Sequence, residues 1–561
     1  MFEQAADISG FAEGGNDQGQ FFHGANRLGR RRRQRCSWNP LHVGSTYHCT
    51  QRLGIEDKYT GLIRLRRRKF LSDLLAVAFF TVLGFAVMGY HPGAEDDGVY
   101  LTAVKACLNP ALYPRDSSFF RLQLQATQFD AWMADFVGWT GIPLAWSELL
   151  WQAISLFVIL LACASIARQL FSDKRAHWGA VAMVSAMFTL PVAGTALTVA
   201  DQYLHPRNLA TALILIAVAT ILAGRRWLAV PLLLLAFLVH PIMAAFGISF
   251  CSILSIASLG GVHEWVESRR LRRTEASAAA AAAPLGWIFS PPTASWRIAL
   301  NSKKYFFLFR WTWYEWLGAI APIFLFWLLW RFAEKRGERR MARFALAVLI
   351  YGVFQQAVAL IVASTPALVR LTPMQPMRFL HLIYLFLALI GGGLLGEYLL
   401  KSSVWRWALF LLATNAGMFA AQRQLFPGSE HLEMPGRPTA NPWQQAFAWI
   451  RENTPTGAYF AVGAHYMSEP GEDYHSFRAL AERSEMADAN KDAAMVAQVP
   501  ELGPVWEREV DAQAGWANFK LADFERLKAE FGVDWVLVAY PQPAGLDCRW
   551  HNEALAVCRI P

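Results

Sequence analysis

Long apolar runs separated by short charged segments occupy most of the chain between residues 70 and 425. A run of about 18 or more apolar residues is long enough to cross ~30 Å of hydrocarbon as a helix. We expect membrane spans near residues 71–90, 148–168, 178–198, 208–223, 227–240, 241–261, 314–332, 342–363, 379–399 and 404–421. The pattern therefore predicts an α-helical protein that crosses a membrane many times.

Clusters of Arg and Lys between the runs predict the direction of each span, because basic residues concentrate in cytoplasmic loops. The clusters lie at residues 30–35, 64–69, 173–177, 224–226, 331–340 and 401–406. Their positions place three segments, and everything after about residue 422, on the outside: 91–147, 199–208 and 367–378. The C-terminus is outside only if the number of crossings is odd, so we expect about nine to eleven. Either an added crossing between residues 262 and 312 or a re-entrant segment around His240 would satisfy this count.

The composition agrees with a membrane protein. The chain is 55% hydrophobic and carries a formal net charge of +9. A basic chain can bind nucleic acid, but these basic clusters flank apolar runs, so we expect a lipid bilayer and no nucleic acid as the partner. Residues 1–69, which precede the transmembrane domain at 70–425, are expected to form a disordered basic cytoplasmic tail.

From residue 440 onward the composition becomes typical of a soluble domain. Helix patterns at 441–453 and 520–532 alternate with strand patterns at 458–462 and 534–540. This alternation predicts a small α/β domain over residues 440–561. Cys548 and Cys558 flank a turn near its end, and outside the cytoplasm we expect them to form a disulfide.

Three adjacent acids follow the first apolar run: Glu95, Asp96 and Asp97. One interpretation is a helix start, where carboxylates accept from free backbone N–H groups and face the positive end of the dipole. Three neighbouring carboxylates also repel one another, which is easier to justify if one acts as a base or if they share a cation. Both interpretations stay open from the sequence alone.

The rest of the segment 91–147 is unusually apolar for a loop in water. Helix patterns at 98–108 and 117–138 carry several aromatic residues. Aromatic amphipathic helices beside a span are typical of elements that lie in the membrane interface. Such helices would roof a polar site that opens toward lipid head groups.

Cationic and imidazole side chains occur at the starts of other spans. His205 and Arg207 lie in one external segment and Arg378 in another. The arginines could snorkel or pair with an acid, or they could bind phosphate through the guanidinium fork. His91 and His240 are further candidates: His91 opens the acidic loop, and His240 precedes a proline at a break in an apolar run, where a packed histidine is the plainer interpretation.

This layout resembles the GT-C superfamily, the polytopic glycosyltransferases that use polyprenyl-phosphate-linked sugars. The resemblance rests on Glu95-Asp96-Asp97 after the first span, on Arg207 and Arg378, and on the phrase WIRENTP at 449–455. Protein O-mannosyltransferases and arabinosyltransferases are similar in layout, and the chain resembles a poorly described bacterial branch most. The fold implied is a GT-C-like helical membrane domain with a small extracytoplasmic α/β domain, in the bacterial inner membrane.

The resemblance also implies a reaction, an inverting hexosyl or pentosyl transfer from a polyprenyl-phosphate donor to a cell-envelope acceptor. Asp96 or Asp97, with Glu95 beside them, would supply the base. Arg207 and Arg378, with His205, would bind the donor phosphate. Asp96 and Asp97 could also hold Mg²⁺ or Mn²⁺ as a cofactor.

Two other classes of function remain open. A transporter of lipid-linked saccharides predicts charges at mid-bilayer and an inverted repeat, and no repeat is visible in the sequence. A non-catalytic membrane protein predicts that substitutions in the acidic cluster are silent. The chain has no P-loop, no dinucleotide glycine fingerprint, no HExxH and no GxSxG, so soluble nucleotide or hydrolase chemistry has no support.

Overall fold

The computed structural model describes residues 53–121, 127–258 and 292–561. The chain divides into two compact units, Met1–Lys69 and Phe70–Pro561. In the first unit the described residues belong to helix α2 (Leu53–Met88), which continues into the second unit. Residues 53–69, the last part of the expected tail, are helical in α2; residues 1–52 lie outside the described residues.

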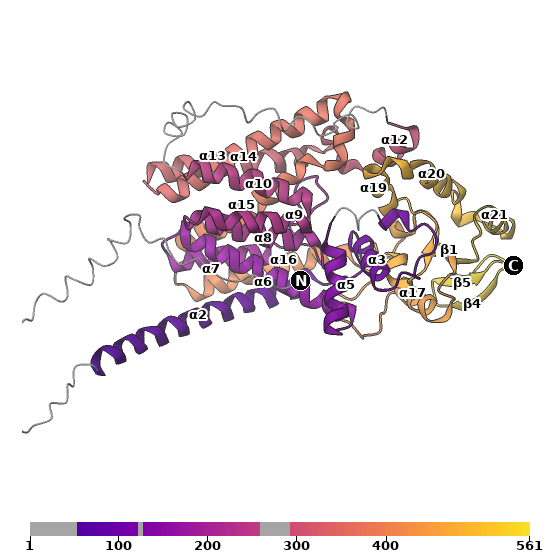
Figure 1. The fold of residues 1–561 in the computed structure, drawn as a ribbon, viewed down its shortest axis with the longest axis horizontal. Helices are drawn as coiled ribbons and strands as arrows, with labels where there is room; N and C mark the ends of the chain where they lie inside the picture. The colour runs from indigo at the N-terminus through magenta and orange to yellow at the C-terminus, as the bar shows by residue number, and fades with distance from the viewer. Residues whose placement is uncertain (1–52, 122–126, 259–291) are drawn as a thin grey trace, which may run out of the picture. The chain divides into compact units, whose positions relative to one another are not determined.

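The apolar runs that predict spans contain helices of the second unit, together with the last part of α2, although the run at 178–198 is helical only in its first half (Figure 1). These helices are α6 (Leu144–Leu170), α7 (Lys174–Ala186), α8 (Pro206–Leu222), α9 (Ala229–Val239), α10 (Pro241–Ala257), α13 (Trp313–Lys335), α14 (Arg339–Ser364), α15 (Leu380–Leu394) with its continuation η8 (Leu395–Leu400), and α16 (Val404–Leu425). The 3-10 turns among them are η1 (Arg226–Leu228), η4 (Lys304–Phe306), η5 (Leu308–Arg310), η6 (Pro366–Met374) and η7 (Pro376–Phe379).

The described part of the chain holds 5 helices that are long and apolar enough to cross a membrane. They are Phe70–Met88, Leu144–Leu170, Trp313–Lys335, Arg339–Ser364 and Pro376–Leu400, and three shorter apolar helices cover Pro206–Leu222, Arg226–Val239 and Pro241–Ala257. The protein is therefore a multi-pass membrane protein. Most of the interval 262–312, where an added crossing is one expectation, lies within 259–291, outside the described residues.

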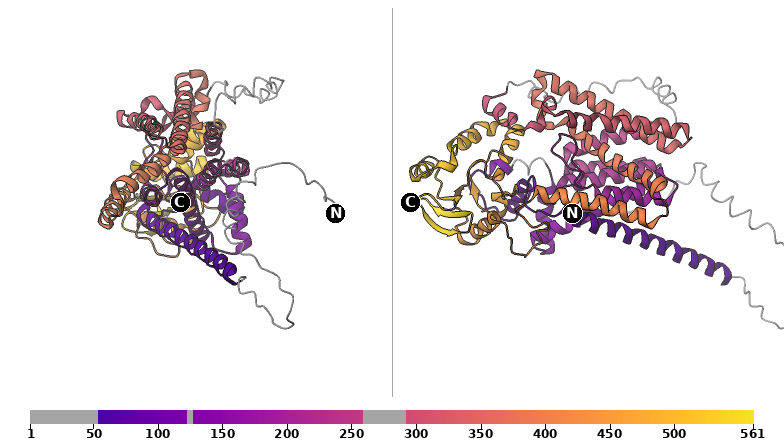
Figure 2. Two further views of the ribbon diagram at one scale, coloured as in Figure 1. Left: turned by 90° about the vertical axis from the view of Figure 1, so that its left-hand side faces the viewer. Right: turned by 180° about the vertical axis from the view of Figure 1, so that it is seen from behind.

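Helices α7 and α15 pack closely because glycines, which have no side chain, lie at their contact. A Cβ on Gly179 of α7 would lie 2.3 Å from the carbonyl oxygen of Gly392 in α15, and Gly396 is equally close to the backbone of Arg175. These glycines therefore let α7 and α15 touch backbone to backbone. Helices α13 and α14 form another adjacent pair, which Figure 2 shows from two further sides.

The expected span at 178–198 is wrong in its second half, because α7 ends at Ala186 and a loop runs from residue 187 to His205. Within this loop Pro191 pairs with Thr198 in an isolated bridge. A Cβ on Gly194 would lie 2.6 Å from the ring of Trp311, so the loop packs inside the protein. An apolar loop buried by protein shows the same composition as a span, and this is why the pattern misled.

The acidic segment contains α3 (Asp97–Leu108) and α5 (Phe129–Thr140). The helix expected at 117–138 is interrupted, because Thr127 and Gln128 are not helical and residues 122–126 lie outside the described residues. Helix α3 packs against the C-terminal region: Lys105 Nζ lies 2.7 Å from Glu482 Oε1 and 2.7 Å from the carbonyl oxygen of Ala479.

The C-terminal region is built around a 5-stranded sheet in the order β2-β1-β3-β5-β4. Its elements are α17 (Pro442–Asn453), β1 (Tyr459–Ala461), η9 (Tyr466–Ser468), α18 (Phe477–Ala481), β2 (Ser484–Glu485), α19 (Lys491–Gln498), η10 (Pro500–Leu502), α20 (Gly503–Ala512), η11 (Trp516–Asn518), α21 (Leu521–Phe531), β3 (Trp535–Ala539), β4 (Asp547–His551) and β5 (Leu555–Arg559). Strand β1 is parallel to β2 and to β3, whereas β5 is antiparallel to both of its neighbours. The expected α/β alternation is therefore present.

Two details of this region bear on the sequence expectations. Cys548 and Cys558 are joined by a disulfide between the antiparallel strands β4 and β5. Helix α12 (Ala294–Asn301), which follows the undescribed segment, packs on α19 and α20, and Trp296 Nε1 donates to the carbonyl oxygen of Ala497 at 2.9 Å. The described part of the interval 262–312 therefore contains a helix that packs on the C-terminal region, followed by the turns η4 and η5.

Candidate functional site

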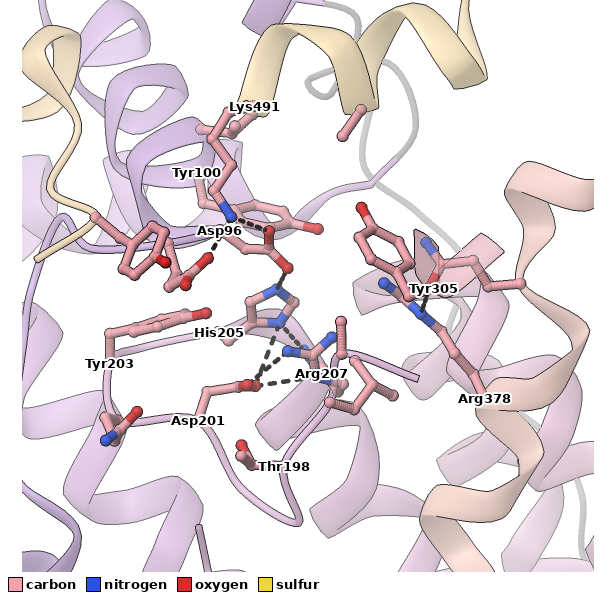
Figure 3. A pocket seen from close by; sticks show the side chains of 18 of the residues that line it. Asp96, Tyr100, Thr198, Asp201, Tyr203, His205, Arg207, Tyr305, Arg378 and Lys491 are labelled. Carbon is pink, nitrogen blue, oxygen red and sulfur yellow. Dashed lines mark hydrogen bonds and ion pairs between the residues drawn. The ribbon is translucent and has the colours of Figure 1, made fainter. Parts of the chain in front are cut away.

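A cavity of about 400 Å³ lies where the acidic loop, the ends of several apolar helices and α19 meet (Figure 3). Charged and polar side chains dominate the part of the wall that Figure 3 labels. The residues that matter for the argument are Glu95, Asp96, Tyr100, Asp201, Tyr203, His205, Arg207, His240, Tyr305, Arg378 and Lys491. Most of the residues singled out from the sequence therefore reach one cavity.

The three adjacent acids separate in the fold. Glu95 and Asp96 line the cavity, whereas Asp97 does not. Asp97 is 2% exposed, and its Oδ2 accepts from the backbone N–H of Gly93 at 2.6 Å. Burial raises the pKa of Asp97 to about 7. Asp97 therefore lies in the first turn of α3 but binds the loop residue Gly93 rather than a free N–H of the helix, and Glu95 and Asp96 are the two acids that face the cavity.

Lys491, at the start of α19, reaches both cavity acids. Its Nζ lies 2.6 Å from Glu95 Oε2 and 3.0 Å from Asp96 Oδ1. About 40% of the Asp96 side chain still faces open space, which is the space of the cavity. The lysine therefore holds one face of the carboxylate and leaves the other accessible.

This ion pair sets the charge state of the cavity acid. Burial raises the pKa of Asp96, but the positive charge of Lys491, with a smaller contribution from Arg207, outweighs it and holds the pKa well below its usual range. Burial lowers the pKa of Lys491, and the charges of Asp96 and Glu95 more than offset this and raise it. Both groups are therefore ionised at neutral pH.

His205 faces Asp96 as a neutral donor. Burial and the nearby Arg207 charge lower the pKa of His205. Its Nδ1 accepts from the backbone N–H of Arg207 at 2.9 Å, so the single proton of the neutral ring is on Nε2. Nε2 lies 3.9 Å from Asp96 Oδ2, which directs this N–H toward the carboxylate and the cavity.

The two arginines differ in how they are held. Arg207 forms a two-bond fork with Asp201, with Nε 3.0 Å from Oδ2 and Nη2 2.5 Å from Oδ1. Its Nη1 is buried without a hydrogen-bond partner among the described residues. Arg378 donates from Nε to Gln375 Oε1 at 2.5 Å, and within the described ranges no carboxylate oxygen lies within 4.0 Å of it. Arg378 therefore brings a charge that the surrounding protein does not pair.

The two further histidine candidates have different positions. His240 lines the cavity, with its ring 5.9 Å from that of His205, and its Nδ1 accepts from the Met243 N–H at 3.3 Å. His91 does not line the cavity. Its Nδ1 lies 2.7 Å from Glu433 Oε1, so it anchors the start of the acidic loop.

Glu433 also binds a second histidine, and this cluster supports the loop from behind. Its Oε2 lies 3.1 Å from His475 Nε2, and Gln444 donates to the same oxygen at 2.9 Å. Ala94 forms a bridge with His475, and the Glu95 N–H donates to the carbonyl oxygen of Tyr474 at 2.8 Å. The position of Glu95 and Asp96 therefore depends on residues that follow them by more than 300 positions.

A divalent cation held by Asp96 and Asp97 does not fit these side chains. Asp97 is turned to Gly93 and lies outside the cavity wall, while Lys491 already occupies the side of Asp96 that Glu95 shares. Over the described ranges, no three His, Cys, Asp or Glu side chains come together in a way that could hold a metal ion.

Comparisons with known proteins give fold neighbours only. No family model matches the chain, and no curated protein matches it. The chain is similar to the oligosaccharyltransferase of Archaeoglobus fulgidus in its apo form, with a TM-score of 0.44 and 13% identity over 84% of this chain and 69% of that chain. Two further structures of that protein also match. The structure of AglB from Archaeoglobus fulgidus with an inhibitory peptide and a dolichol-phosphate matches with a TM-score of 0.42 and 13% identity, over 84% of this chain and 70% of that chain. The Archaeoglobus fulgidus oligosaccharyltransferase in complex with Zn and sulfate matches with a TM-score of 0.42 and 14% identity, over 83% of this chain and 67% of that chain.

Sequence reasoning missed Lys491, Asp201 and Tyr305, which belong to the same cavity. Lys491 lies in the first turn of α19, where a cation opposes the positive end of the helix dipole. A lysine in that position needs a compensating acid, and this was the available signal. Asp201 and Tyr305 carried no comparable signal.

Proposed function

We propose that the protein is a membrane glycosyltransferase of the GT-C type that transfers a sugar from a polyprenyl-phosphate donor to a hydroxyl group of a cell-envelope acceptor. The observation that carries the proposal is the content of one cavity: an ionised carboxylate, Asp96, and the guanidinium of Arg378, which has no carboxylate partner among the described residues. Such a pair can activate an acceptor on one side and stabilise a leaving anion on the other.

The donor phosphate would bind at the arginine side of the cavity. Arg378 has free N–H groups, and the buried Nη1 of Arg207 lacks a partner among the described residues. Arg207 is held in place by Asp201, so its remaining donor has a fixed direction. Arg207 lies in the first turn of α8, where backbone dipoles also favour an anion, and Arg378 lies in the short turn η7 just before α15. These donors would stabilise the charge that develops on the departing phosphate.

The acceptor would bind beside Asp96. As its hydroxyl oxygen attacks the anomeric carbon, Asp96 takes the hydroxyl proton, and the bond from the carbon to the phosphate oxygen breaks with its electron pair leaving on the lipid phosphate. A single displacement of this kind inverts the anomeric centre. The low pKa of Asp96 keeps the carboxylate ionised but makes it a weak base. Proton transfer is therefore late, when the attacking oxygen has become acidic.

A smaller cavity supports a lipid-linked donor. It measures about 210 Å³ and shares Tyr305, Phe306 and Gln375 with the first cavity. Most of its remaining wall is apolar and comes from the end of α14, from η6 and from the 305–310 segment. A chain of isoprene units leaving the phosphate near Arg378 would find an apolar path here, whereas a free nucleotide sugar would not need one.

The basic clusters favour an external site in the inner membrane, with the C-terminal region outside. About nine to eleven crossings remain the expectation for this topology. The five long apolar helices and the three shorter ones make eight, so nine or more crossings would also need α7 or α16.

The test is transfer by the purified chain in proteoliposomes, with radiolabelled polyprenyl-phosphate sugars and an extract of envelope acceptors. The Asp96→Asn variant should lose transfer by roughly 100-fold or more, the range of a lost general base. Asp135→Asn is the matched control, because Asp135 is exposed in α5 and outside the cavity wall. Full activity of Asp96→Asn, or movement of the intact donor across the bilayer without cleavage, would contradict the proposal.

A further inference from the structure

A second cavity, of about 640 Å³, lies in the C-terminal region at the carboxyl ends of β1 and β3. The segments that follow the two strands form one side, through Gly463, His465 and Pro541. The other side comes from the end of α20, through Asp511, and from η11, through Trp516.

The sheet topology makes this a favoured place for a ligand. Strand β1 has β2 on one side and β3 on the other, both parallel to it. The chain leaves β1 for β2 and later returns past β1 to form β3, so the connections run in opposite directions. In open α/β sheets, ligands bind outside the carboxyl ends of the strands at such a switch point.

The backbone is shaped to keep the crevice open. Gly463 follows β1 with a φ of +93°, a conformation that favours glycine. A Cβ at this position would lie 2.9 Å from Cδ1 of Trp516. The absence of a side chain thus lets the Trp516 ring approach the strand end and form a wall of the cavity.

The lining is aromatic and rich in hydrogen-bond acceptors. Five aromatic side chains contribute: Trp443, Tyr466, Trp516, Phe519 and Phe524. Two carboxylates, Glu469 and Asp511, also line it, whereas the residues that make up this cavity's wall include no Lys or Arg.

Four exposed polar side chains have no hydrogen-bond or ion-pair partner among the described residues, and they are His465, Glu469, Asp511 and Asn518. Their partners would come from a bound molecule or from water.

We propose that this second cavity binds a saccharide that carries no anionic group. Sugar hydroxyls are hydrogen-bond donors that match the two carboxylates and the amide oxygen of Asn518. The apolar face of a pyranose ring matches the aromatic wall at Trp516. Phosphate or carboxylate groups on the ligand would meet two negative charges and no cation. The assignment does not depend on catalysis at the first cavity, so it can fail or hold separately.

The experiment is isothermal titration calorimetry of the full chain in lipid nanodiscs. Nanodiscs are preferred to maltoside micelles because the detergent head group is itself a saccharide. The probes are neutral hexose oligosaccharides, a glucosamine oligomer and a uronate oligomer of equal length. We expect at least one neutral oligosaccharide to bind with a Kd between about 10 μM and 5 mM, and the uronate oligomer to bind at least about tenfold more weakly.

Two variants locate the binding. Trp516→Ala should weaken the neutral oligosaccharide about tenfold through lost stacking. Asp511→Asn, a nearly isosteric change at an exposed site that keeps the fold, should weaken it about threefold to tenfold. Glu530→Gln, an exposed carboxylate outside the cavity, should leave binding unchanged. The proposal is overturned by any one of three results: no neutral oligosaccharide binds, the uronate binds equally well, or both cavity variants bind like the unaltered chain.

Discussion

The two cavities of this protein differ in how they treat charge. The first cavity brings Glu95, Asp96 and Asp201 together with Arg207, Arg378 and Lys491, and nearly every charge is paired. The second cavity has two carboxylates and a histidine, all without partners in the described part of the chain. The first resembles a site where charge is moved during a reaction, because opposite charges are held ready at fixed positions. The second is a surface for a neutral ligand.

The difference also lies in how far apart along the chain the parts of each cavity are. The second cavity is made within the C-terminal region, between Trp443 and Leu555. The first joins Glu95 to Lys491 across more than 390 positions, so it exists only when the acidic loop and the C-terminal region are docked. Changes that disturb this docking should affect the first cavity much more than the second.

The largest effect is expected from Glu433→Gln, which weakens the support behind the acidic loop. Glu433 is buried between His91 and His475. Burial raises the pKa of Glu433, but the charge of His475 and hydrogen bonds from both histidines outweigh it and lower the pKa to about 2. Removing one member of a buried ion pair costs roughly 3–5 kcal/mol. Thermal unfolding should show this loss, while exposed Glu452→Gln should unfold like the unaltered chain.

The same pair predicts how stability depends on pH. Burial lowers the pKa of His475, and Glu433 more than offsets this and raises it to about 9, above the ordinary value of 6.5. A raised folded-state pKa gives stability that is complete below about 6.5 and is lost as the pH rises through 9. Unfolding temperatures should therefore fall between pH 6.5 and 9 in the unaltered chain. The opposite slope in this window would rule out a charged His475.

Arg378→Gln should reduce transfer by about 100-fold, the usual scale for one lost group that stabilises a developing anion. Arg378→Lys should restore part of the rate, because it keeps the charge but loses the fork geometry. Steady-state rates in proteoliposomes measure both, with Arg437→Gln as an exposed control. Oligosaccharide binding in the second cavity should not change. A simultaneous loss of both properties would mean that the variant is misfolded rather than inactive.

Lys491→Met should act on the acidic limb of the pH–rate profile. Because the Lys491 charge holds the Asp96 pKa down, its removal raises that pKa, and protonation then begins at higher pH. Transfer should fall about tenfold near pH 5 and much less near pH 8. Lys491→Arg keeps the charge and should keep the profile. If the acidic limb does not shift in Lys491→Met, ionisation of Asp96 does not control the rate of transfer.

The smallest effect is expected from Asp511→Asn on transfer itself. With a small soluble acceptor that does not need a second contact, the rate should change by less than about twofold. A loss comparable to that of Arg378→Gln would show that the two cavities are not independent.

The sequence predicted the elements better than their contacts. Apolar runs located the membrane helices, and helix and strand periods located α17, β1, α21 and β3, because these patterns are local. The same patterns could not distinguish a span from the buried loop after Ala186, since both are apolar. Docking contacts between distant segments leave no periodic trace, and this is why Lys491 and the Glu433 cluster were not found.

The candidate site was predicted in part for a similar reason. Four cavity residues were predicted because an ionisable side chain next to an apolar run is energetically unfavourable and is usually functional. They are Asp96, His205, Arg207 and Arg378. The sequence could not tell which acid of the trio faces the cavity, because this depends on the Glu95 φ of +50° and on the Gly93 N–H that turns Asp97 inward. Asp201 was not predicted because its part in the site is a hydrogen bond to Arg207, a contact that the sequence pattern does not show.

The most direct measurement is the anomeric configuration of the product formed by the purified chain from a polyprenyl-phosphate sugar, read by proton NMR from the anomeric coupling constant. An attack assisted by Asp96 on the face opposite the phosphate predicts complete inversion, with the lipid phosphate released in equal amount. Retention of configuration, or the absence of any cleavage of the donor, would contradict the account.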